Sequence, residues 1–216
     1  MSKRLVIFDL DGTLLDTIGD LARACNFVMQ RHGYPQHSIE RYRTLVGNGV
    51  SKLIERALPD EVRSAESAER LRPEFIDYYN RHISGHTLPY PGIPELLDTL
   101  SQRGIMTAVA SNKYIEGTRK LIESFFPNVP FIAVLGQRDG VPVKPDPQIV
   151  SEILNKAGLS PLEALYVGDS GVDMQTAMNA GVESVGVGWG FRSKEELMEN
   201  KACHIVDTAG EILNLV

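Results

Sequence analysis

The chain has 216 residues, of which 43% are hydrophobic and 23% are charged. The length fits one large globular domain, or a core with a smaller insertion, and it excludes a small disulfide-stapled scaffold. The composition leaves little room for extended disorder. The formal net charge of −6 disfavours binding to nucleic acid or to an anionic membrane surface, because like charges repel.

The amino-terminal residues and the two cysteines bear on the compartment. The apolar run of residues 5–8 stops at Asp9, so it is too short for a signal peptide, and no later run approaches the length of a membrane span. Cys25 and Cys203 stand far apart and belong to no CxxC pair or metal-binding pattern. We therefore expect a reduced, cytoplasmic protein without a membrane partner.

The first third of the chain changes from strand to helix. Residues 4–8 form a short β-branched and aromatic run that stops at an acidic, glycine-containing turn, which predicts a buried first strand. Residues 17–83 have helical spacing, with a first helix from Ile18 that ends near Gly33. Further helices are predicted over residues 39–45, 50–58 and 65–83. With no convincing strand among them, these helices indicate a small all-helical unit.

Strands and helices alternate after residue 92. The predicted strands cover residues 106–110, 131–135, 164–167 and 184–187, with a weaker one at 204–206, and the predicted helices cover 94–103, 115–125, 147–157 and 171–180. Repeated βα units imply a parallel sheet with helices on both faces. The expected fold is α/β: a Rossmann-like, doubly wound core of residues 1–15 and 84–216, with an inserted helical cap at 16–83. We expect hinges near Asp16 and residues 88–92.

The distinctive polar residues follow the predicted strands. In open α/β sheets the carboxyl ends of the strands are where ligands bind. A set of carboxylates, one ammonium group, one hydroxyl and loop amides suits Mg²⁺ and a phosphoryl group better than a hydride donor or a peptide. The residues are Asp9 and Asp11 after the first strand, Ser111 and Asn112 after the second, Lys144 before a helix, and Asp169 and Asp173 after the fourth strand.

Four motifs in this order resemble those of the haloacid dehalogenase superfamily. They are Asp9-Leu10-Asp11-Gly12-Thr13, Ser111, Lys144, and Gly168-Asp169-Ser170 with Asp173. The resemblance covers essentially the whole chain, because the helical insertion falls where one subclass of that superfamily carries its cap. It implies a magnesium-dependent phosphomonoester hydrolase that acts through an aspartyl-phosphate.

The resemblance also implies a role for each motif. Asp9 would be the nucleophile, and Asp11 would protonate the leaving oxygen and later deprotonate the attacking water. Asp9, the backbone carbonyl of Asp11 and Asp169 would hold Mg²⁺, with Asp173 as a further ligand or as a residue that orients the ligands. Ser111 and Lys144 would bind the phosphoryl oxygens.

One segment of the cap, residues 43–49, resembles the cap loop of phosphoglycolate phosphatases within the superfamily. It carries Arg43 shortly before a turn bracketed by glycines. Such a loop could reach the catalytic residues and present a cation to a second anion on the substrate. We therefore predict 2-phosphoglycolate, or a similar small phosphate ester, as the substrate. The predicted substrate-binding residues are Thr13, Arg43, Gly47, Asn48 and Asn112.

Other interpretations remain open at this stage. A sugar-phosphate mutase or phosphatase, or a pyrophosphatase, would use the same scaffold, and a phospho-aspartate receiver domain is the alternative that is not an enzyme. Ser111 and Asp173 also fit ordinary roles at helix starts, and Arg43 and Lys144 fit solvated side chains. Residues 186–190 are expected to form a flexible loop that carries Trp189. A monomer or a homodimer is expected.

Overall fold

The computed structural model describes residues 2–216, and its core is a sheet of six parallel strands in the order β5-β4-β1-β6-β7-β8. From β1 the chain moves outward to β4 and β5 and then returns to the other side of β1 to form β6, β7 and β8. The strand order therefore reverses at β1, which makes its carboxyl end a ligand-binding position. The strands are β1 (Leu5–Phe8), β4 (Met106–Tyr114), β5 (Ala133–Gln137), β6 (Ala164–Gly168), β7 (Glu183–Val187) and β8 (His204–Val206).

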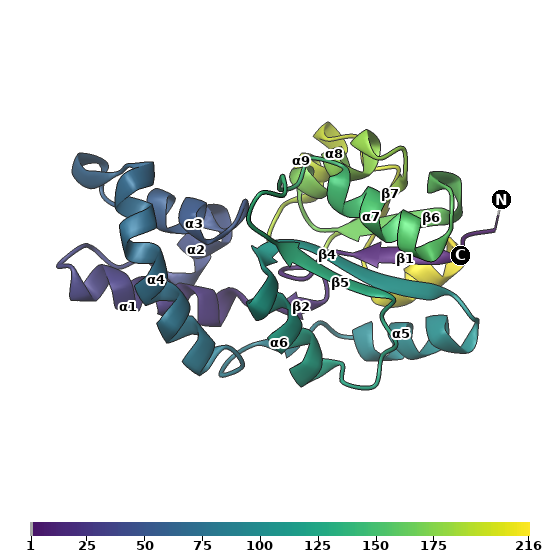
Figure 1. Ribbon diagram of the computed structural model, residues 1–216, viewed down its shortest axis with the longest axis horizontal. Helices are drawn as coiled ribbons and strands as arrows, with labels where there is room; N and C mark the ends of the chain where they lie inside the picture. Colours follow the sequence, from purple (N-terminus) through teal and green to yellow (C-terminus); the bar gives the residue numbers. More distant parts are fainter. Residues whose placement is uncertain (1) are drawn as a thin grey trace.

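Helices cover both faces of this sheet (Figure 1). On β1, Val6 and Phe8 enter one hydrophobic cluster while Leu5 and Ile7 enter a second, because successive side chains of a strand point to opposite faces. The first cluster includes residues of α5 (Ile93–Gln102) and α6 (Ile115–Phe125). On the other face lie α7 (Gln148–Ala157), α8 (Gly171–Asn179) and α9 (Lys194–Glu199). Elsewhere in the core, short 3₁₀ turns occur at Pro161–Glu163 and Ala209–Asn214.

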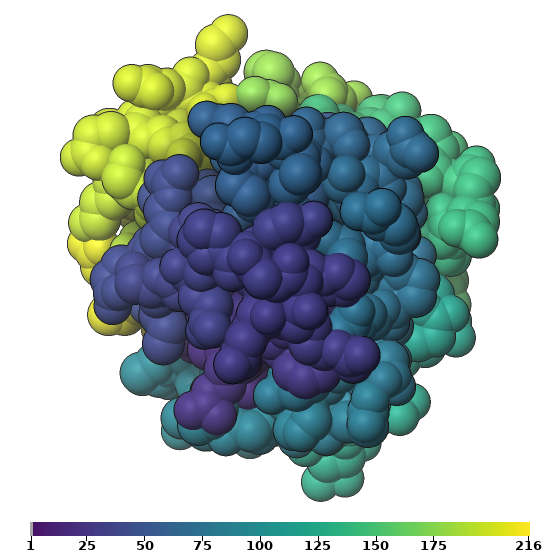
Figure 2. All heavy atoms as spheres, turned by 90° about the vertical axis from the view of Figure 1, so that its left-hand side faces the viewer, coloured from purple at the N-terminus to yellow at the C-terminus, as the bar shows by residue number. Residues whose placement is uncertain are grey.

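The inserted helices form a separate lobe at one end of the core (Figure 1), and Figure 2 shows this lobe in front of the core. They are α1 (Ile18–Arg31), α2 (Ile39–Leu45), α3 (Val50–Ala57) and α4 (Ala65–His82), with a short 3₁₀ turn at Asp60–Val62. The first helix buries Leu21, Cys25, Val28 and Met29 along one stripe, and α1 and α3 both pack against α4. The predicted fold class, an α/β core with an all-helical insertion, is confirmed.

A two-stranded antiparallel sheet joins the lobes where hinges were predicted. It pairs β2 (Leu15–Asp16) with β3 (Leu88–Pro89), neither of which was predicted as a strand. Close to it, Asp20 at the start of α1 is buried, and its carboxylate accepts hydrogen bonds from the backbone N–H groups of His86 and Thr87 and from the Thr87 hydroxyl. One carboxylate thus ties together the two chain segments that lead into and out of the cap.

Two predicted strands differ from the structure, and one helix was not predicted. The strand predicted to end at residue 110 continues to Tyr114, with irregular pairing between Ala110 and Tyr114. Its polar final residues resemble a loop in sequence, yet they are buried. The strand predicted at 131–135 lies at Ala133–Gln137, and α9 was not predicted. The glycine-rich segment before α9 is also not loose, because the Trp189 indole donates to the carbonyl of Thr13.

Two findings concern membranes and disulfides. In residues 2–216, no helix has both the length and the apolar character that a bilayer crossing requires. Cys25 is buried and Cys203 is exposed, and both are free thiols.

The Asp20 contacts predict a large stability loss on truncation. Asp20→Ala would leave the donors of residues 86 and 87 without their charged acceptor, so we expect the free energy of unfolding to fall by about 2–4 kcal/mol. Urea titration followed by circular dichroism measures this loss. Asp98→Ala, which removes an exposed carboxylate of α5, is the control and should change the free energy by no more than about 0.5 kcal/mol. Equal effects of the two substitutions would show that Asp20 does not anchor the cap.

Candidate active site

The site begins where β1 ends. Asp9 follows Phe8 directly, and its backbone N–H donates to the carbonyl of Val167 on the neighbouring strand β6, at 2.9 Å. The chain then turns at Gly12, whose φ of +87° is in the left-handed region. A Cβ atom there would lie 2.3 Å from Oδ2 of Asp169, so only glycine allows the turn to pass this close to the carboxylate.

Three carboxylates meet in this position. Asp9, Asp169 and Asp173 are all buried, and one oxygen from each lies within 4.8 Å of the other two. Asp169 follows β6, while Asp173 lies in the first turn of α8, where it forms a capping box with Ser170. The sequence prediction placed these three side chains together, and the structure does so as well.

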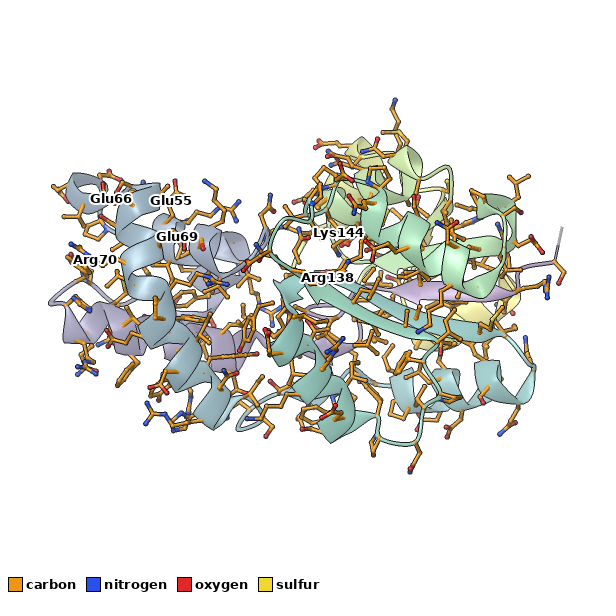
Figure 3. The ribbon with its side chains drawn as sticks, in the orientation of Figure 1. Glu55, Glu66, Glu69, Arg70, Arg138 and Lys144 are labelled. Carbon is orange, nitrogen blue, oxygen red and sulfur yellow. The ribbon has the colours of Figure 1, made fainter. Side chains whose placement is uncertain are left out.

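One ammonium group lies among the carboxylates. Nζ of Lys144 lies 2.7 Å from Oδ1 of Asp173 and 3.0 Å from Oδ1 of Asp9, and it also donates to the hydroxyl of Tyr166 and to the carbonyl of Ala110. Lys144 is buried, so it is not the solvated lysine that the sequence also allowed. Figure 3 shows Lys144 in the core, at the end that faces the helical cap.

Burial and mutual repulsion shift the pKa values of these groups. The pKa of Asp9 is raised to about 6, mainly by burial and then by Asp173 and Asp11, while Lys144 opposes the shift. The pKa of Asp169 is also well above its ordinary value, mainly because of burial and then because of Asp173 and Asp9. Burial would lower the pKa of Lys144, but its two carboxylate neighbours outweigh that effect and raise it.

Asp11 points to different partners. Its carboxylate accepts a hydrogen bond of 2.7 Å from the Thr17 hydroxyl, and both of its oxygens accept from Nζ of Lys113, at 3.1 and 3.2 Å. Lys113 is almost fully buried, and its ammonium also lies 4.6 Å from the centre of the Tyr79 ring on α4. The Asp11 carboxylate is therefore paired separately from the acidic cluster, and Lys113 contacts both the core and the cap.

Two predicted substrate-binding residues have internal partners. The amide of Asn112 donates to the carbonyl of Lys144 and accepts from the N–H of the same residue, so it fixes the backbone that carries the lysine. The Thr13 hydroxyl is buried and donates to Oδ1 of Asp169 at 3.3 Å. The hydroxyl of Ser111 accepts from the N–H of Lys113, and Ser111 does not cap the following helix.

A cavity of about 140 Å³ lies over these residues. Its floor is formed by core residues that include Asp9, Asp11, Ser111 and Lys144, and its opposite wall is formed by residues 46–50 of the cap. Three of the predicted substrate-binding residues, Gly47, Asn48 and Asn112, line this cavity. Thr13 is not among the lining residues.

Arg43 does not line this cavity. Its guanidinium lies 3.9 Å from Asp16 at the hinge and 5.8 Å from the centre of the Phe191 ring. The arginine that does line the cavity is Arg192, from the loop before α9. The sequence interpretation named neither Arg192 nor Lys113. The sequence carried no signal for Lys113, because the polar residues 111–113 resemble a loop and only the structure shows that this lysine is buried and therefore needs an anionic partner. Arg192 carried no signal either.

The donor set fits a divalent cation. Carboxylate oxygens are the ligands that Mg²⁺ prefers, and three ionised carboxylates beside one ammonium leave two negative charges uncompensated. Oδ1 of Asp9 is buried and accepts no hydrogen bond from residues 2–216, although the Lys144 ammonium is near. A buried carboxylate oxygen without a donor is well suited to a metal ion.

The fold and this arrangement define a class of protein, the capped α/β hydrolases with an acidic site at the switch point of the sheet. Comparison with known proteins agrees, because a model of haloacid dehalogenase-like hydrolases matches residues 6–187. The chain belongs to this family, whose phosphatases generally use a metal ion, and it is a phosphatase.

Individual relatives match over nearly their whole lengths. The phosphoglycolate phosphatase of Vibrio parahaemolyticus is 36% identical in an alignment that covers 99% of this chain and 96% of the relative. The phosphoglycolate phosphatase of Mesorhizobium japonicum is also 36% identical, over 90% of this chain and 86% of the relative. The crystal structure of a proposed phosphoglycolate phosphatase from Lactobacillus delbrueckii subsp. bulgaricus has a TM-score of 0.93 at 33% identity, and it covers 100% of this chain and 98% of its own.

The raised carboxylate pKa values predict proton release on metal binding. Below its pKa of about 6, Asp9 is mostly protonated in the metal-free protein, and a metal ion binds the ionised form. Mg²⁺ should therefore bind more weakly and release more protons near about pH 5.5 than near about pH 7.5. Calorimetric titration in buffers of different ionisation enthalpy measures the protons released. Asp9→Asn should reduce the release at the lower pH, and a pH-independent release would contradict the prediction.

The same shift affects stability. Since the folded protein holds a proton on Asp9 between about pH 4 and pH 6 that the unfolded chain has lost, the metal-free protein should lose stability as the pH rises through this range. Thermal unfolding with and without Mg²⁺ at each pH checks the sign of this effect.

Proposed function

We propose that the protein hydrolyses 2-phosphoglycolate, or a similar small phosphate ester, with Mg²⁺ as cofactor and an aspartyl-phosphate at Asp9 as intermediate. The observation that carries the proposal is the position of Asp9. Its carboxylate lies on the floor of a small cavity, beside the Lys144 ammonium and opposite residues 46–50 of the cap, which would face the leaving group.

In the first step, an oxygen of the Asp9 carboxylate attacks phosphorus and displaces the alkoxide. The Ser111 hydroxyl accepts from a backbone N–H, which leaves its own hydrogen free to donate to a phosphoryl oxygen. Lys144 supplies positive charge beside the same oxygens, and Asn112 holds its backbone in place. When bound, Mg²⁺ would add a Lewis acid held by Asp9, the carbonyl of Asp11 and Asp169, with Asp173 as a further ligand or an orienting residue.

Asp11 transfers the protons in both steps. It protonates the leaving alkoxide, and it then takes a proton from the water that attacks the aspartyl-phosphate. In the structure its carboxylate is held by Thr17 and Lys113, so it is ordered but paired away from Asp9. The hydrogen bond from Thr17 links this carboxylate to the residue that directly follows the hinge strand β2.

The size and wall of the cavity favour a small leaving group. About 140 Å³ is less than the roughly 300–1,000 Å³ of clefts that hold drug-sized ligands. Gly47 and Asn48 are the cap residues that would face the leaving group, and the named relatives support a glycolate moiety there. Arg43 lies outside the cavity, so we no longer assign it to the substrate.

The rival functions differ in what they require. A receiver domain is excluded by the six-stranded sheet with an inserted cap and by the family match. A mutase, a sugar-phosphate phosphatase or a pyrophosphatase remains the alternative on the same scaffold. We further propose a cytoplasmic protein, monomeric or homodimeric, with a small phosphate ester and neither nucleic acid nor membrane as its partner, in keeping with its negative charge and free thiols.

Substitutions of the two aspartates separate nucleophile from acid and base. Asp9→Asn should abolish turnover while the thermal midpoint stays similar, because an amide fills the volume of a carboxylate but is a poor nucleophile. Asp11→Asn should slow turnover of an alkyl phosphate by about 10²- to 10⁴-fold. With an aryl phosphate, whose leaving group needs no proton, Asp11→Asn should still form the aspartyl-phosphate. Burst kinetics with that substrate make the measurement, and a burst in Asp9→Asn would place the nucleophile elsewhere.

A turnover screen tests the substrate. We expect kcat/KM for 2-phosphoglycolate to exceed the values for glucose 6-phosphate, a nucleoside monophosphate and pyrophosphate by about tenfold or more, which corresponds to about 1.4 kcal/mol of transition-state binding. A higher value for the hexose phosphate or for pyrophosphate would favour the rival enzymes. Phosphate release with Mg²⁺ present and then chelated gives both the ranking and the metal requirement.

A further inference from the structure

Arg192 reaches from the core to the cap. It follows Phe191 in the loop before α9, and its side chain is only 19% exposed. Its guanidinium donates to the carbonyl of Val46 at 2.5 Å and to the carbonyl of Arg43, and both acceptors lie at the carboxyl end of α2 in the cap. Nε of Arg192 also lies 3.6 Å from Glu196 on α9. No substrate is needed for these contacts.

The acceptors are carbonyls that a helix end leaves unpaired. The last carbonyls of an α-helix have no partner within the helix, and they carry the negative end of its dipole. A second arginine, Arg56 of α3, donates to the carbonyls of Leu45 and Gly47 from within the cap. Burial, and after it the positive charge of the nearby Arg192, lowers the pKa of Arg56, and both guanidiniums donate to backbone carbonyls of residues 43–47.

The backbone can pass this close to the Arg192 guanidinium only because the residue at position 47 is glycine. Gly47 has a φ of +121°, and a Cβ atom there would lie 3.3 Å from Nη2 of Arg192. The turn that lines the cavity thus passes directly against the guanidinium. The carbonyls that hold Arg192 shortly precede Gly47 and Asn48, which line the cavity, so an arginine of the core fixes the position of the cap loop.

The same core loop is attached to the acidic cluster. The backbone N–H of Phe191 donates to Oδ2 of Asp169 at 2.7 Å, and the Trp189 indole donates to the carbonyl of Thr13. Arg192 is the next residue along the chain. One peptide bond therefore separates Phe191, which binds a carboxylate of the candidate metal site, from Arg192, which binds the cap.

We propose that Arg192 is a positioning residue that latches the cap loop, residues 43–49, over the catalytic carboxylates. The latch holds the cavity closed by donating from the core to the end of α2. It acts through the loop and not by contact with the leaving group. This inference concerns the position of the cap, so it can be tested without reference to the substrate proposed above.

Hydrogen exchange of the substrate-free protein tests the latch. Arg192→Ala should speed exchange of the amides in the last turn of α2 and in residues 46–49 by about tenfold or more, because opening no longer breaks the bonds to the core. Arg192→Lys, which keeps a cation but not the planar fork, should give a smaller increase. The control is Arg103→Ala, which removes a guanidinium that donates to the Leu213 carbonyl within the core and should leave this segment unchanged.

A distance measurement separates latching from local support of the loop. Nitroxide labels at the exposed positions Glu61 of the cap and Glu123 of α6, in a Cys203→Ser background, report the separation of cap and core. Arg192→Ala should broaden this distance distribution toward longer values. Arg56→Leu, which loosens the loop from within the cap, should speed exchange but leave the distribution narrow.

Two results would overturn the proposal. The first is unchanged exchange and an unchanged distance distribution in Arg192→Ala, provided that the variant is folded by circular dichroism. The second is an unchanged loop combined with a raised KM for 2-phosphoglycolate alone, which would make Arg192 a direct substrate contact. The latch instead predicts a lower kcat/KM for 2-phosphoglycolate and also for a phosphate ester whose aryl leaving group carries no charge. If no phosphate ester is hydrolysed, the proposed function fails, while the exchange result still decides the latch.

Discussion

The structure depends on one electrostatic constraint: Lys144 is the only cation inside the acidic cluster of Asp9, Asp169 and Asp173 that the described residues provide. Ionised carboxylates in a buried position are costly unless they are paired or bind a metal. The elevated pKa values of Asp9 and Asp169 show that one lysine does not balance the set. The cluster is thus stable as protonated acids or as metal ligands, which is a suitable starting point for a metal-dependent reaction.

The surrounding backbone meets this constraint with fixed donors. Asp173 accepts from the N–H and hydroxyl of Ser170, and Asp169 accepts from the hydroxyl of Thr13 and the N–H of Phe191. These donors come from three separate segments that meet where the strand order reverses at β1. Donors held by the fold need no reorganisation when charge moves during the reaction, and this is the main electrostatic advantage of an enzyme site over water.

Much of this could be predicted from the sequence, because apolar runs and helical periodicity determine which faces are buried. The acidic residues were identified because each follows a strand, and parallel strands end at the same edge. The direction of a side chain has no such signature. Asn112 bonds to Lys144 and Thr13 bonds to Asp169, Arg43 lies outside the cavity, and Arg192 enters it from a loop that the sequence presents only as glycine-rich.

Asp11 links the core to the cap, because its partner Lys113 also contacts a helix of the cap. Its partner Lys113 projects from the irregular end of β4, and the ring of Tyr79 on α4 lies against the same ammonium at 4.6 Å. An aromatic face attracts a cation, most strongly where water is excluded. The cap therefore contributes to holding Lys113, and through Lys113 it affects the residue proposed to move the proton. A displacement of α4 would weaken one of the two contacts of Lys113, so the geometry of Asp11 is coupled to the position of the cap as well as to the core sequence around it.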